Sequence, residues 1–134
     1  MERTVTVVTD VKDVSDFLNG ACLEQIQVAP LGGTLQFTAE LTRAMMERQT
    51  VVRQGWRRKV KTPWTKCQLV LRGVRDATVC QPSDHSSDTP LLCCDAIKGG
   101  YRMTIQVPQG LQLVLNLEHL DGEFSDVGSP TEAP

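Results

Sequence analysis

The residues best suited to chemistry are basic and aromatic side chains gathered in one stretch of the 134-residue chain. Residues 43–66 hold eight of the 14 Lys and Arg residues and a single acid, Glu47. The stretch carries +7 and the remainder −9, so the net charge of −2 hides a strong segregation. Both tryptophans, Trp56 and Trp64, fall inside it. A block of one sign produces a local field that attracts oppositely charged partners.

This basic stretch is open to three interpretations. Arg and Lys neutralise phosphates and indoles stack on unpaired bases, which would suit single-stranded nucleic acid. Trp and Arg are also enriched at protein–protein hot spots, which would suit a docking surface for an acidic protein. The stretch could instead be a solvated hairpin whose tryptophans pack on their own sheet. No established nucleic-acid motif accompanies the charges. The predicted contact residues are Trp56, Arg57, Arg58, Lys59 and Trp64.

Four potential zinc ligands lie within 15 residues, namely Cys80, His85, Cys93 and Cys94. Structural zinc sites repeat close ligand pairs such as C-x2-C, which this spacing lacks. Adjacent Cys93 and Cys94 would also point to opposite sides of an extended backbone. We therefore predict inert thiols, with no metal and no cofactor. The odd number of cysteines, five, and the absence of a signal-peptide pattern favour reduced thiols in the cytoplasm.

Acid–base catalysis would depend on His119, which lies close in sequence to Glu118, Asp121 and Glu123. Such a group could move protons or hold a cation if it lined a pocket. A charged segment where a strand ends is the commoner origin of this pattern. The chain also lacks phosphate-binding, nucleophile-elbow and zinc-protease motifs. We therefore expect a protein that is not an enzyme.

Hydrophobic periodicity places the elements that would position these residues. Apolar side chains repeat with helical spacing over about residues 11–19. Alternation of apolar and polar residues predicts a hairpin from residues 24–30 and 34–41. A further strand is predicted over residues 67–74, with Gly73 at a bulge. A second pair is formed by residues 103–107 and by the leucine-rich residues 111–117.

These elements predict an α+β protein that is mostly antiparallel β, with about five to seven strands and one short N-terminal helix. We expect one globular domain over residues 1–121 and a flexible tail over 122–134. The basic stretch would be either a long loop or the outer end of a hairpin. The apolar sheet face needs a cover, from the helix together with a second sheet, a curled sheet or a dimer partner. No apolar run approaches the ~20 residues needed to cross a bilayer.

The order of elements resembles that of a known group of proteins. A short helix ends in residues 17–23 (FLNGACL), a strand follows at residues 69–74 (LVLRGV), and residues 111–117 (LQLVLNL) form the closing strand. This order, over most of residues 11–120, is similar to small bacterial β-rich domains of unknown function, some of which are labelled toxin-immunity proteins. The resemblance implies a non-enzymatic binding protein and transfers no functional residue. The basic stretch and the Cys93–Cys94 pair depart from it.

The sequence as a whole predicts a cytoplasmic, non-membrane protein that acts by binding through residues 43–66. The leading partner is another protein or a second copy of the chain, which would make an oligomer. The alternative is a single-stranded nucleic acid bound by the same residues.

Overall fold

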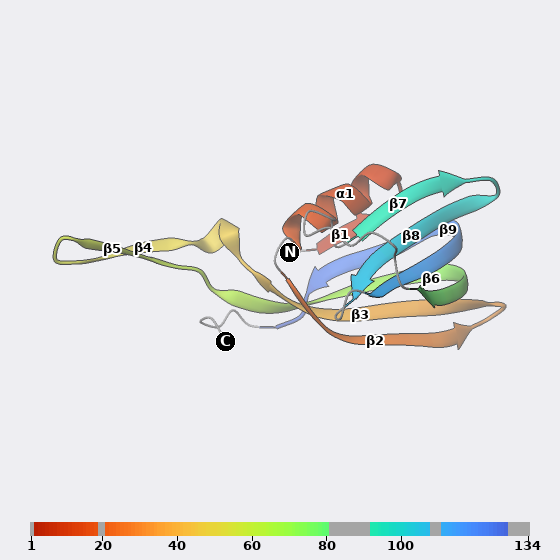
Figure 1. Ribbon diagram of the computed structural model, residues 1–134, viewed down its shortest axis with the longest axis horizontal. Helices are drawn as coiled ribbons and strands as arrows, with labels where there is room; N and C mark the ends of the chain where they lie inside the picture. Colours follow the sequence, from red (N-terminus) through yellow and green to blue (C-terminus); the bar gives the residue numbers. More distant parts are fainter. Residues whose placement is uncertain (1, 19–20, 81–91, 108–110, 129–134) are drawn as a thin grey trace.

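A computed structural model of the chain describes residues 2–18, 21–80, 92–107 and 111–128. These residues form a curled antiparallel sheet with one helix, and a separate two-stranded hairpin projects from the sheet (Figure 1). The strands of the main sheet are β1 (Glu2–Val5), β2 (Cys22–Leu31), β3 (Thr34–Ala44), β6 (Trp64–Cys80), β7 (Leu92–Ile97), β8 (Gly100–Val107) and β9 (Leu111–Asp126). Their order is β2-β3-β6-β9-β8-β7, and β1 pairs with the C-terminal end of β9.

The predicted fold class is confirmed, since the described residues form antiparallel strands and one helix. The nine strands in this part of the chain exceed the five to seven expected. β7 is not among the predicted strands, and the two strands of the projecting hairpin, β4 (Thr50–Gln54) and β5 (Arg57–Lys61), correspond to one of the two alternatives left open for the basic stretch. The two predicted strand pairs are confirmed as β2 with β3 and β8 with β9. The turn expected at residues 108–110 lies outside the described residues.

The helix α1 (Val8–Phe17) begins three residues before the predicted start. The Asp10 carboxylate accepts hydrogen bonds from the backbone N–H groups of Thr6 and Val7, at 3.0 and 3.2 Å, and these bonds fix the first turn. The helix buries the face that carries Val11 and Val14. No helix in residues 2–18, 21–80, 92–107 or 111–128 combines the length and the apolar character needed to cross a membrane.

The sheet curls at a bulge near Gly73, as the sequence predicted. Gly73 has a φ of 70°, which favours glycine, and the pairing of β6 with β9 shifts register on either side of Val74. Along β9 the buried side chains stand at odd positions as far as Leu117. From Leu120 onward they stand at even positions. Bulges bend a strand and increase its twist. The curled sheet therefore wraps its own apolar face, and α1 packs beside β1 and β7 to cover the remainder (Figure 1).

The C-terminal boundary differs from the prediction. Residues 122–126, expected to be the start of a tail, form the end of β9. Phe124 is 0% exposed and lies between its register partners Arg3 in β1 and Leu69 in β6. These residues are therefore part of the folded sheet, whereas residues 129–134 lie outside the described part of the chain.

Candidate functional site

The basic stretch forms a projecting hairpin, which we define as the arm, residues 48–63. It is inserted between β3 and β6 and extends away from the sheet (Figure 1). A 3-10 turn, η1 (Met46–Arg48), stands at its base. The arm holds six Lys and Arg residues and no Asp or Glu, which leaves the rest of the chain at −8 because the net charge is −2. Of the two predicted alternatives, the outer end of a hairpin is therefore confirmed over the long loop.

The tip of the arm is a two-residue turn made by Gly55 and Trp56. Gly55 has a φ of 65°, the conformation that a tight hairpin turn requires at its first central position. This turn leaves Trp56 89% exposed, with the Arg57 guanidinium 5.2 Å from the ring centroid. The interpretation in which both tryptophans pack on the sheet is therefore wrong for Trp56.

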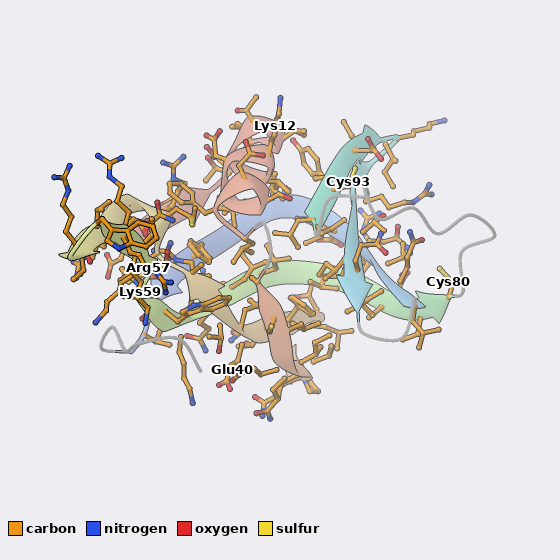
Figure 2. The ribbon with its side chains drawn as sticks, turned by 60° about the vertical axis from the view of Figure 1, so that its left-hand side comes forward. Lys12, Glu40, Arg57, Lys59, Cys80 and Cys93 are labelled. Atoms are coloured by element: carbon orange, nitrogen blue, oxygen red, sulfur yellow. The ribbon has the colours of Figure 1, made fainter. Side chains whose placement is uncertain are left out.

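Cations occupy both faces of the arm. Arg53 lies directly opposite Arg58 in the register, so both project from one face. Arg57 and Lys59 project from the other face, because successive side chains alternate along a strand. Figure 2 shows the side chains of Arg57 and Lys59 on this hairpin. Among the described residues, no carboxylate forms an ion pair with any of these four.

The arm also exposes apolar surface. Val51 and Val60 face each other across the two strands, and both side chains are exposed. An open groove of about 460 Å³ lies beside them at the base of the arm. Its lining residues are Arg48, Thr50, Lys59, Val60, Lys61, Thr62 and Pro63. The two valines form a small exposed apolar pair framed by cations, which a partner could cover.

Trp64 does not join the other predicted contact residues. It begins β6, lies opposite Ala44 in β3, and is half-buried. Seven residues, 57–63, lie between it and Trp56, which corresponds to roughly 25 Å of extended chain. The structure thus gathers Trp56, Arg57, Arg58 and Lys59 on the outer arm and leaves Trp64 at the sheet.

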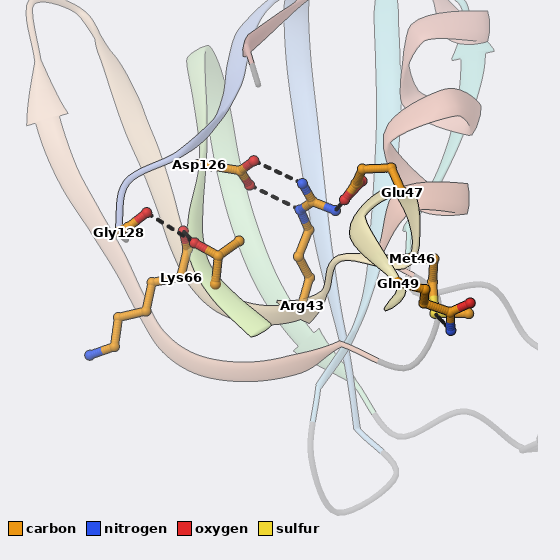
Figure 3. Close-up of polar contacts among 8 residues, drawn as sticks. Arg43, Met46, Glu47, Gln49, Lys66, Asp126 and Gly128 are labelled. Atoms are coloured by element: carbon orange, nitrogen blue, oxygen red, sulfur yellow. Dashed lines mark hydrogen bonds and ion pairs between the residues drawn. The ribbon is translucent and has the colours of Figure 1, made fainter. Parts of the chain in front are cut away.

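Arg43 is a structural residue and not part of the basic surface. Its side chain is 1% exposed. Nε and Nη2 donate to Asp126 Oδ1 and Oδ2 at 2.9 and 2.8 Å, and Nη1 donates to Glu47 Oε1 at 2.8 Å (Figure 3). The guanidinium also lies 5.8 Å from the centroid of the Phe17 ring. Hydrogen bonding to Asp126 raises the pKa of Arg43 above the ordinary value for arginine.

This cluster fixes the base of the arm. Arg43 joins β3 to the end of β9 and, through Glu47, to η1. The Met45 N–H donates to the Pro63 carbonyl at 2.8 Å, and Gln49 Nε2 donates to Thr62 Oγ1 at 3.0 Å. The hairpin therefore leaves the sheet from a position held by buried and backbone contacts.

The structure also places the residues considered for acid–base catalysis and for metal binding. His119 is exposed on β9, next to exposed Glu118, at the point where the buried side chains change from odd to even positions. Among the described residues, no three His, Cys, Asp or Glu side chains are grouped closely enough to hold a metal ion, and His85 lies outside them. The Cys93 side chain is exposed and that of Cys94 is buried, which confirms that the adjacent thiols point to opposite sides.

Thiol reactivity provides a test of these placements. All five cysteines are free, with Cys22, Cys80 and Cys93 exposed and Cys67 and Cys94 buried. Burial raises the pKa of Cys67 to about 12 and that of Cys94 to about 11. We expect a disulfide reagent at about pH 8 to modify the three exposed thiols in the native protein and the other two only after unfolding. Rapid modification of all five in the native state would contradict the described core.

Comparisons with protein-family models, curated proteins and solved structures found no match for this chain. The resemblance to immunity-labelled bacterial domains therefore stays a prediction.

Proposed function

We propose that this chain is a non-enzymatic binding protein whose contact element is the arm. The observation that carries the proposal is a hairpin that projects from the sheet with Trp56 89% exposed at its tip and with cations on both faces, four of which form no ion pair with a carboxylate in the described part of the chain. The outer part of the arm contributes no residue to the hydrophobic core. Its side chains are therefore available to a partner.

The energetics of the arm favour a binding role over a purely structural one. An isolated two-stranded hairpin is marginally stable in water. Like charges placed directly opposite, as Arg53 and Arg58 are, lower that stability further. An anionic partner would remove this repulsion and would cover Val51 and Val60. Exposed Trp and Arg are also the side chains that contribute most at binding hot spots.

The chemistry of the arm admits three partners: a protein with an acidic surface, a second copy of this chain, or a nucleic acid. A second copy is compatible in charge, because the chain outside the arm carries −8. An immunity-like role would be one case of the first partner. A cytoplasmic location belongs to the same proposal, and the five free thiols support a reducing compartment.

The test compares the wild type with a variant that combines Trp56→Ala and Arg57→Glu. We expect this variant to keep the wild-type melting temperature to within about 2 °C, because surface substitutions change stability by about 0.5 kcal/mol or less. Both proteins are immobilised and exposed to a cell lysate, and the retained protein and nucleic acid are quantified. The wild type should retain a partner that the variant loses.

Two outcomes would contradict the proposal. If the variant unfolds, the tip of the arm is a structural element. If wild type and variant retain the same macromolecules in equal amounts, the contact element lies elsewhere. Lys12→Glu with Arg102→Glu is the control, since it reverses two exposed cations outside the arm and changes the net charge by −4, against −2 for the tested variant.

A further inference from the structure

The distribution of charge on the arm restricts the shape of its partner. Arg53 and Arg58 project from one face, and Arg57 and Lys59 from the other. A flat acidic protein surface would neutralise one face and leave the other. A partner that neutralises both must surround the hairpin with negative charge.

The grooves of a DNA duplex have this shape. The major groove of B-DNA is about 12 Å wide and admits a two-stranded β-ribbon, whose strands lie about 4.8 Å apart. Phosphates line both walls of the groove, so cations on the two faces of one ribbon meet opposite walls. Single-stranded nucleic acid is favoured less, because Trp56 and half-buried Trp64 are too far apart to form one stacking platform.

The position of the arm separates it from the negative remainder of the chain. Each arm strand has five residues, a length of roughly 17 Å. This exceeds the Debye length of about 8 Å at physiological ionic strength. The −8 outside the arm therefore repels DNA weakly at the tip, although it would oppose contact between DNA and the sheet.

We infer that the arm inserts into the major groove of duplex DNA and holds it through phosphate contacts, with Trp56 leading at the tip. This inference rests on the proposed function and names its partner. Five arm cations have no carboxylate partner among the described residues and are available for phosphate contacts. They are Arg48, Arg53, Arg57, Arg58 and Lys59.

The experiment measures fluorescence anisotropy with a labelled duplex of about 20 bp, one strand of the same duplex, and a labelled polyglutamate, over about 50–200 mM salt. The duplex should bind most tightly. Five phosphate contacts give a slope of log affinity against log salt of about −4 to −5, and a loss of about 10²- to 10³-fold across this range.

The decisive variant combines Arg53→Gln with Arg58→Gln. It should reduce the magnitude of the salt slope by about 2 and weaken duplex binding at low salt by at least about tenfold. Its melting temperature should equal or exceed that of the wild type, because the opposed like charges are gone. The matched control, Lys12→Gln with Lys98→Gln, removes the same charge outside the arm and should stay within about twofold of wild-type affinity.

Other results would overturn the inference. It fails if the double variant binds duplex as the wild type does, if the single strand binds more tightly than the duplex, or if no nucleic acid binds at low salt. Tighter binding of polyglutamate through the same two arginines would also overturn it but would leave the arm as the contact element. The lysate comparison separately decides whether the proposed function itself fails.

Discussion

Replacing Arg43 with Met should lower the free energy of unfolding by about 3–5 kcal/mol, as expected when one partner of a buried ion pair is removed. The substitution leaves the Asp126 carboxylate, 9% exposed, without the two hydrogen bonds that it accepts from Arg43. Glu47 is 41% exposed and can be solvated after the change. Urea denaturation of the wild type and of the variant measures the difference.

A second substitution separates the loss of the ion pair between Arg43 and Asp126 from the loss of packing. Arg43→Met combined with Asp126→Leu should recover much of the lost stability, because the carboxylate that Arg43 neutralises is removed together with it. Arg72→Met is the control, since the ion pairs of this partly exposed arginine are 3.6 Å long and it should cost less than about 1 kcal/mol. If the single Arg43→Met variant were as stable as the Arg72→Met control, the buried ion pair of Arg43 with Asp126 would not stabilise the fold.

The same cluster determines a dependence on pH. Burial is the largest single influence and raises the pKa of Asp126, but the hydrogen bonds and the positive charge of Arg43, together with further lowering contacts, hold that pKa below the ordinary value. A depressed pKa stabilises the fold above the unfolded pKa of about 4, and this contribution is lost as the pH falls through the folded value. The acid-induced loss of stability should therefore be smaller in Arg43→Met than in the wild type.

Phe124→Ala should cost about 3–5 kcal/mol, the usual range for emptying a buried aromatic site. Phe124 is fully buried between β1 and β6, so its removal leaves a cavity where three strands meet. The neighbouring control is Val127→Ala, whose exposed side chain should contribute about 0.5 kcal/mol or less. Equal stability of the two variants in urea would mean that residues 122–126 do not complete the sheet.

The contrast between predicted and observed strands has a physical cause. The β2–β3 and β8–β9 hairpins could be predicted because their apolar residues alternate without interruption. The end of β9 could not, because the bulge opposite Gly73 moves the buried set from odd to even positions. Polar residues at exposed positions there, such as Glu118 and His119, then resemble a turn and a tail. Local alternation does not reveal a change of phase imposed by a neighbouring strand.

The candidate site was predictable in composition but only partly in geometry. Charge and Trp content located the stretch, and Gly55 beside Trp56 is a usable turn signal. The opposition of Arg53 to Arg58 requires the register of the hairpin. The burial of Arg43 had a signal that the basic character of the stretch concealed, because Arg43 continues the inward row of Phe37, Ala39 and Leu41.

The measurement that tests the central claim most directly is an NMR titration of nitrogen-15-labelled protein with a DNA duplex of about 20 bp at low salt. The account predicts shift changes concentrated in the arm, largest for the Trp56 indole and the amides of β4 and β5, with α1 and the centre of β9 unchanged. Changes centred on the sheet or on α1, or no change at all, would contradict it.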